Sequence, residues 1–255
     1  MSGNVTLPRL LLRERVVILV AVAVIAALCW LYLLQLDQSM SDMAMPMSPR
    51  WTLLSFALTF FMWSVMMAGM MLPGATPMIL TFAALCQRHA DGTVRRLAQT
   101  LFFVSGYLVV WSGVSLLATF LQWGLDRLGL LSPMLATTSA RLGSLLFVLA
   151  GLYQMTPVKH VCLRYCRSPF AFLFNRWRDG WNGALRMGIE HGAYCLGCCW
   201  LLMALLFALG VLNLLWVAAI TLFVFGEKLV RGGVWFTRIG GIAIAGYGVW
   251  LAVQA

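Results

Sequence analysis

The sequence predicts an all-α fold, a polytopic bundle of about seven transmembrane helices with the N-terminus in the cytoplasm. Three observations predict it. The 255 residues are 62% hydrophobic and only 10% charged, whereas roughly a quarter of the residues of a soluble domain are charged. Apolar segments long enough, or nearly so, to cross ~30 Å of hydrocarbon follow one another along the chain. The basic residues gather in alternate loops, which is typical of membrane proteins.

The apolar segments are separated by short polar or basic stretches. The first follows Arg15 and has no small-residue cleavage site after it, so we expect a retained helix rather than a signal peptide. The sixth is short, and only Gly210 and the nearby polar Asn213 mark its boundary with the fifth, so these two segments are expected to form a tight helical hairpin. The seven segments are residues 16–36, 51–72, 97–123, 141–156, 193–209, 211–226 and 236–253.

The charge distribution sets the expected topology. With a cytoplasmic N-terminus, all of the 18 basic residues except Arg50, Arg127 and Arg141 fall on the cytoplasmic side, as the positive-inside rule requires. The net charge of +10 is therefore attributed to cytoplasmic loops. The expected partner of the chain is the lipid bilayer, and no nucleic-acid partner is expected. We expect one membrane domain over residues 1–255, with a cytoplasmic tail (1–15), a methionine-rich external loop (37–50) and a basic cytoplasmic loop (158–187).

An enzymatic function is not expected. The sequence has no dinucleotide-binding or P-loop glycine pattern and no evident Ser/His/Asp arrangement. Asp126, Glu190 and Glu227 all lie near the ends of predicted spans, and the neighbouring Glu227 and Lys228 are interpreted as an interfacial pair. Charged residues deep within spans, which would suggest function, are not predicted.

Cysteine and histidine are concentrated on the predicted cytoplasmic side. Every histidine and six of the seven cysteines lie there, where thiols are kept reduced and structural disulfides are not expected. Metal ligation, redox chemistry and plain packing as small apolar residues remain open. The richest stretch is "GIEHGAYCLGCC", which begins at Gly188.

On a helix with ~100° per residue, His191, Cys195, Cys198 and Cys199 share one face. They also span ~12 Å of rise, too far for one straight helix to surround an ion whose bonds are ~2.0–2.3 Å long. A second segment is needed, and "KHVCLRYCRSP" offers one because Cys162 and Cys166 are an i, i+4 pair. Thiolate-rich sites favour soft ions, so copper as Cu(I) is expected and zinc is the alternative.

Methionines form a stripe in the second apolar segment. Met66 and Met70 lie one helical turn apart, and thioethers are soft ligands that suit Cu(I), although methionine also fills gaps in apolar cores. Pro73 and Pro77 are expected to break this helix near its inner end. A further group of methionines occupies the predicted external loop, namely Met40, Met43, Met45 and Met47.

Three segments together resemble a known family. These are "MWSVMMAGMMLPGATPM" from Met62, "LYQMTPVKHVCLRYCRSP" from Leu152 and "GIEHGAYCLGCCWLLM" from Gly188. They are similar to a bacterial family of predicted metal-binding integral membrane proteins, and the resemblance extends over most of residues 50–255. It implies metal binding and a bacterial inner-membrane location. The matching positions are Met66, Met67, Met70, Met71, Pro73, Pro77, Cys162, Cys166, His191, Cys195, Cys198 and Cys199.

Three functions follow as hypotheses. The first is handling of Cu(I) or another soft ion by transport, by delivery or by assembly of a metalloenzyme, with a membrane metalloenzyme or a metallochaperone as partner. The second is thiol–disulfide electron transfer, because Cys195 and Cys198 have C-x-x-C spacing. The third is a structural or assembly subunit of a larger membrane complex. The metal ligands expected under the first are His191, Cys195, Cys198, Cys199, Cys162, Cys166, Met66 and Met70.

Overall fold

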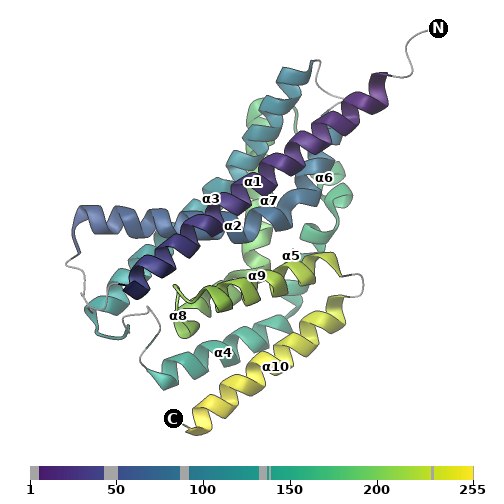
Figure 1. Cartoon of the computed structure of the whole chain (residues 1–255). Coiled ribbons are helices and arrows are strands. Elements are labelled where there is room, and N and C mark those ends of the chain that lie inside the picture. The colour runs from purple at the N-terminus through teal and green to yellow at the C-terminus, as the bar shows by residue number, and fades with distance from the viewer. Residues whose placement is uncertain are drawn as a thin grey trace.

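The protein is all-α throughout the part that the structure describes. The computed structural model describes residues 6–42, 51–86, 92–131, 137, 139–230 and 233–254, and within them the chain forms helices and no strand (Figure 1). The all-α part of the predicted fold class is thereby confirmed. The helices are α1 (Thr6–Asp42), α2 (Leu53–Cys86), α3 (Thr93–Arg127), α4 (Ala140–Gln154), α5 (Pro157–Arg167), α6 (Pro169–Arg176), α7 (Gly180–Ala204), α8 (Leu206–Leu209), α9 (Leu214–Leu229) and α10 (Gly233–Gln254).

Five helical stretches are long and apolar enough to cross a membrane. They lie in α1, α2, α3, α7 with α8, and α10, and α4 with α5 would add a sixth if this pair, bent by 65°, is one span. α9 has 16 residues and is not among these candidates, so length and composition alone do not support the predicted sixth span, residues 211–226. The number of spans and the cytoplasmic N-terminus therefore stay predictions.

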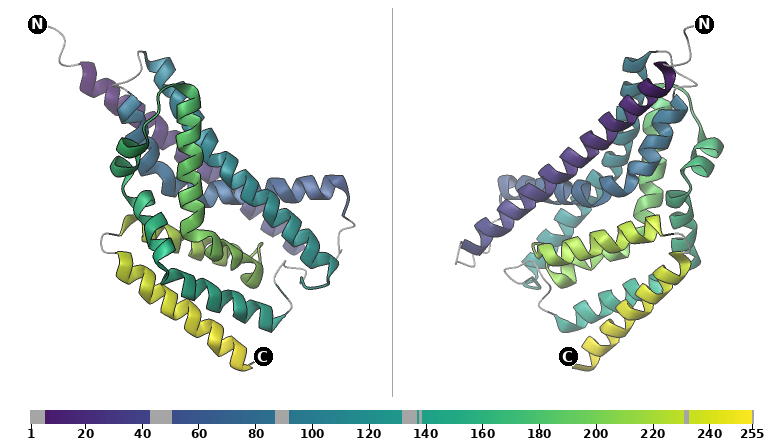
Figure 2. Two further views of the ribbon diagram at one scale, coloured as in Figure 1. Left: turned by 180° about the vertical axis from the view of Figure 1, so that it is seen from behind. Right: turned by 45° about the vertical axis from the view of Figure 1, so that its right-hand side comes forward.

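The helices are arranged as two groups that meet at α9. Figure 1 shows α1, α2, α3 and α7 together at the end that carries the N-terminus, while α4 and α10 lie side by side at the opposite end with the C-terminus. The views in Figure 2 agree on this arrangement. α5 continues from α4 towards α7 and α9, so it links the two groups.

Glycines allow the closest helix crossings. A Cβ atom on Gly188 of α7 would lie 2.0 Å from the carbonyl oxygen of Phe103 in α3, and a Cβ on Gly151 of α4 would lie 2.4 Å from the backbone nitrogen of Ala245 in α10. No side chain fits at either point. Small residues at crossings are the usual means by which helices in apolar surroundings approach closely.

The predicted break at Pro73 and Pro77 is wrong. α2 runs as one helix from Leu53 to Cys86 through both prolines, although Figure 1 shows it changing direction along its length. Proline removes one backbone hydrogen bond, but on the same stretch of α2 the side chains of Met71, Leu72, Ala75 and Met78 are buried in the core. Packing against neighbouring helices and local backbone adjustment let a helix continue through proline.

Helices occupy parts of the predicted tail and loops, whose places relative to a membrane stay predictions. Much of 158–187 is helical, because it contains most of α5, all of α6 and the start of α7. Thr156 caps α5 by accepting a hydrogen bond from the backbone nitrogen of Lys159, and Pro157 occupies the first turn, a favoured helix start. α1 already begins at Thr6 and continues to Asp42, and residues 43–50 of the methionine-rich loop lie outside the described residues.

The predicted hairpin between the fifth and sixth segments is confirmed. Gly210 has φ +95° and ends α8, a backbone conformation that glycine adopts without steric cost. α9 then starts after Asn213. The turn returns α9 towards α5 and α7, which matters for the site described next.

Candidate metal centre

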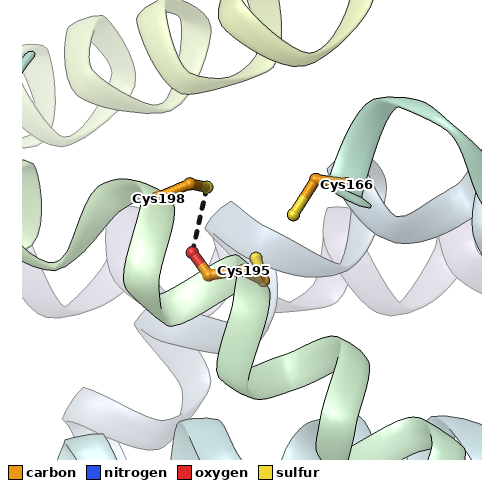
Figure 3. A group of neighbouring side chains, drawn as sticks. All are labelled: Cys166, Cys195 and Cys198. Atoms are coloured by element: carbon orange, nitrogen blue, oxygen red, sulfur yellow. Dashed lines mark hydrogen bonds between the residues drawn. The ribbon is translucent and has the colours of Figure 1, made fainter. Parts of the chain in front are cut away.

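Three thiols from two helices converge on one point. The Sγ atoms of Cys166 on α5 and of Cys195 and Cys198 on α7 all lie within 4.8 Å of one another. Figure 3 shows the three sulfurs pointing into the space between the two helices. Within the described ranges, no other three side chains of histidine, cysteine, aspartate or glutamate are gathered in this way.

The two α7 thiols are held by an intact helix. Cys195 and Cys198 are an i, i+3 pair, so their side chains share a face. The thiols of Cys198 and Cys199 both donate to the carbonyl oxygen of Cys195, at 3.0 and 3.1 Å. α7 is continuous from Gly180 to Ala204, so the C-x-x-C sequence lies in the middle of a helix and the chain does not unwind around it.

Burial differs among the three thiols. Cys195 and Cys198 are essentially inaccessible, at 0% and 1% exposure, whereas Cys166 is only partly buried. A ligand arriving from outside would therefore meet Cys166 before the other two.

Lys228 and Tyr107 both contact Cys195. The Lys228 ammonium group on α9 donates to Cys195 Sγ at 3.2 Å. The Tyr107 hydroxyl on α3 lies 3.2 Å from the same sulfur and donates to the carbonyl oxygen of Met71 at 3.1 Å. A buried cation next to a cysteine sulfur stabilises the thiolate, which is the form that binds metals.

The interpretation of Glu227 and Lys228 as a mutual interfacial pair is wrong. Glu227 instead pairs with Lys159 of α5 at 2.8 Å, and neither side chain is exposed. Lys228 turns the other way, towards Cys195. The sequence does contain a signal for both residues, because they directly follow a strongly apolar segment. Ionisable residues in such segments are often functional.

A second contact reinforces the link between α5 and α9. The Arg167 guanidinium group donates through Nε to the backbone carbonyl oxygen of Glu227 at 2.6 Å, and its Nη2 bonds the same oxygen. Together with the Lys159–Glu227 pair, this contact holds α5 against α9 from both of its ends. Cys166, next to Arg167, is thereby placed opposite Cys195 and Cys198.

The other predicted ligands lie outside the group of three thiols. Cys162 Sγ packs against Gly197 so closely that a Cβ there would be 2.8 Å away. His191 is buried, its ring stacks on Tyr107 and Phe103, and its Nδ1 has no hydrogen-bond partner. Cys199, Met66 and Met70 are also buried. As metal ligands, these five residues stay predictions.

The thiol group is the right size for a soft metal ion. Metal–sulfur bonds of ~2.3 Å place three sulfurs around one ion about 4 Å apart, so the observed sulfurs within 4.8 Å need only a small contraction. Three thiolates suit Cu(I), whereas structural zinc takes four ligands. Among the described residues, no fourth cysteine, histidine or carboxylate joins this group.

A family model described as a copper chaperone, PpoB2, matches residues 60–251. The match includes all three clustered cysteines, together with Tyr107 and Lys228. No curated protein matches the chain, and no solved structure does.

Proposed function

Because the chain belongs to the copper chaperone family PpoB2, we propose that it is a multi-pass protein of the bacterial inner membrane that holds Cu(I) for delivery to a copper-requiring protein. Copper is its cargo, and Cys166, Cys195 and Cys198 are the ligands that carry it. The observation on which the proposal depends is the convergence of these three thiols within 4.8 Å. No catalytic activity is proposed.

The charges around the site suit a cation held by thiolates. Lys228 already places one positive charge 3.2 Å from Cys195 Sγ. Three thiolates, Lys228 and one Cu(I) ion together leave a net charge of −1, so the ammonium group offsets part of the negative charge of the loaded site. Uncompensated charge is costly where water is excluded.

The remaining predicted ligands are proposed as supporting positions. His191 has an unbonded ring nitrogen close to Cys195, and the methionines Met66 and Met70 lie on the buried face of α2. They supply soft or neutral donors along a route to and from the thiols. Cys162 and Cys199 hold the same place in the proposal.

The membrane location rests on the long apolar helices and on their surfaces. Large apolar side chains of α1, including Leu19, Leu28 and Leu31, are about half exposed, as expected for a surface that contacts lipid. With the N-terminus in the cytoplasm, the C-terminal end of α5 and the three thiols lie near the inner face of the membrane.

Thiol–disulfide electron transfer is less well supported. C-x-x-C pairs that cycle between thiol and disulfide gain reactivity from the start of a helix, but Cys195 and Cys198 occupy the middle of α7. The third thiol has no role in a simple two-cysteine exchange. We therefore retain metal handling as the function.

The direct test is the copper content of the purified full-length protein. We expect one Cu(I) per chain after anaerobic loading, and loss of that copper to a competing chelator at least 100-fold more readily in Cys195→Ser and Cys198→Ser. Cys86→Ser is the matched control, because Cys86 is a buried cysteine that lies outside the group of three thiols. Wild-type protein that binds no copper after loading would refute the proposal.

A further inference from the structure

A pocket opens directly beside the three thiols. It has a volume of about 300 Å³ and is lined by Gly74, Pro77, Cys166, Arg167, Lys228, Leu229 and Val230. The last two residues are 52% and 45% exposed, so they form its outer rim at the end of α9. This volume is at the lower end of the range for small-molecule sites.

The inner wall of the pocket is part of the thiol site. Cys166 lines the pocket and its sulfur lies within 4.8 Å of the sulfurs of Cys195 and Cys198. Lys228 also lines it and contacts Cys195 Sγ. A molecule in the pocket could therefore touch the accessible thiol while the two buried thiols stay covered.

The positive charge of the pocket favours an anionic occupant. Arg167 and Lys228 are both cationic, and no acidic side chain is among the lining residues. Free Cu(I) would be repelled by this wall, whereas a complex of Cu(I) with two thiolates carries net negative charge. Carboxylates on the same thiol molecule would add to the attraction.

We propose that this pocket is the port at which copper is exchanged with a small, carboxylate-bearing thiol that carries Cu(I). The inference rests on the proposed function, since it specifies how the cargo reaches the same three cysteines. Its carrier is a molecule the size of a short thiol peptide, such as glutathione.

The exchange is a ligand substitution at copper. The Cys166 sulfur forms a bond to the copper of the carrier complex, one bond between copper and the carrier sulfur breaks, and the Cys166 proton passes to the departing carrier thiolate. Copper remains Cu(I) throughout. The ion then gains bonds to the Cys195 thiolate, next to which Lys228 lies, and to the Cys198 sulfur, whose proton passes to the remaining carrier thiolate as it leaves.

The test changes the charge of the rim without touching the thiols. Leu229→Glu, Leu229→Lys and the neutral Leu229→Gln are compared in the purified full-length protein in nonionic detergent, without oxygen. Copper is supplied as the anionic complex with glutathione, and transfer is followed in stopped flow by the ultraviolet absorbance of the copper–thiolate bonds. Leu128→Glu is the control, because Leu128 follows α3, is 72% exposed and does not line the pocket.

We expect Leu229→Glu to slow transfer roughly three- to tenfold at low salt and Leu229→Lys to accelerate it, with both effects shrinking at high salt. Leu229→Gln and Leu128→Glu should match wild type. When copper is supplied instead as its cationic acetonitrile complex, the order of the two charged variants should reverse.

Two results would overturn the port. One is equal transfer rates for Leu229→Glu and Leu229→Lys from the glutathione complex. The other is a change in the amount of copper bound at equilibrium with no change in rate. Wild-type protein that binds no copper from either donor would instead refute the proposed function, so the two failures are distinguishable.

Discussion

The α4–α10 pair and the region where α5, α7 and α9 meet are built on different physical principles. α4 and α10 approach through glycine, with Gly151 against Ala245, and no charged side chain of either helix is buried in the described residues. The region around the three cysteines, which we call the thiol region, contains Lys159, Glu227 and Lys228, all buried.

This difference distinguishes the α4–α10 pair, which supports the fold, from the thiol region, which forms the site. Close packing of small residues is sufficient to join two helices in apolar surroundings, so α4 and α10 need no charges. Buried charges cost free energy unless they are paired, and here they are concentrated beside the thiols. The thiol region therefore bears an energetic cost that the α4–α10 pair avoids, which is the expected mark of function.

The largest effect is expected from breaking the buried ion pair. Lys159→Met leaves the Glu227 carboxylate buried without its partner at 2.8 Å, and we expect the free energy of unfolding to fall by ~3–5 kcal/mol. Replacing both residues, in Lys159→Met with Glu227→Met, should restore most of it. Thermal unfolding in detergent measures both. Equal losses in the single and double variants would contradict a role for the charge pair.

Replacing one glycine by alanine in each group of helices tests the comparison between the thiol region and the α4–α10 pair. Gly188→Ala and Gly151→Ala each force a methyl group into a neighbouring backbone, and overpacking of this kind costs ~1–3 kcal/mol. Only Gly188→Ala should also weaken copper binding, because α7 would move away from Tyr107 and α3. Melting curves and copper competition on the same samples separate the two effects. A matching loss of copper affinity in Gly151→Ala would erase the proposed distinction.

Removing the charge next to the thiols should affect copper more than folding. Lys228→Gln loses the positive charge that contacts Cys195 Sγ, and groups that support metal ligands typically change affinity by ~10–100-fold. We expect a decrease of that size in competition with a Cu(I) chelator. Arg186→Gln, which changes a largely exposed residue of α7, is the control. Unchanged affinity in Lys228→Gln would show that the ammonium group has no part in the site.

The smallest expected effect is that of Tyr107→Phe. It removes a hydroxyl that bonds the Met71 carbonyl and lies beside Cys195 Sγ, and one such hydrogen bond is worth ~1 kcal/mol. Copper affinity should fall less than in Lys228→Gln, because no charge is lost. Tyr247→Phe, on α10, should leave affinity unchanged when measured in the same chelator competition. A larger loss in Tyr107→Phe than in Lys228→Gln would reverse the assigned order.

The sequence predicted the helices and part of the site because both depend on local patterns. Apolar runs indicated most of the helices, and Gly210 correctly marked the turn between α8 and α9. Spacing along a helix placed Cys195 and Cys198 on one face. Distance arithmetic then required a second segment, and the structure brings Cys166 of that segment to them.

The remainder could not be predicted because it depends on contacts between distant segments. Nothing in the local sequence separates Cys166 from Cys162, although only Cys166 joins the thiol group. Lys228 follows Glu227, and adjacency suggested a pair that the helix geometry forbids, because neighbouring residues on a helix point in different directions. The continuity of α2 through two prolines likewise depends on how the buried face of α2 packs against other helices.

The division of the three sulfurs between two helices sets the mechanical character of the site. Two are fixed on the 25-residue α7, and the third is on the 11-residue α5, which contacts α9 through Lys159 and Arg167. A small tilt of α5 would widen the triangle of sulfurs without disturbing a single backbone hydrogen bond of α7. Capture and release of the ion would then depend on movement of the short helix α5 relative to the longer α7.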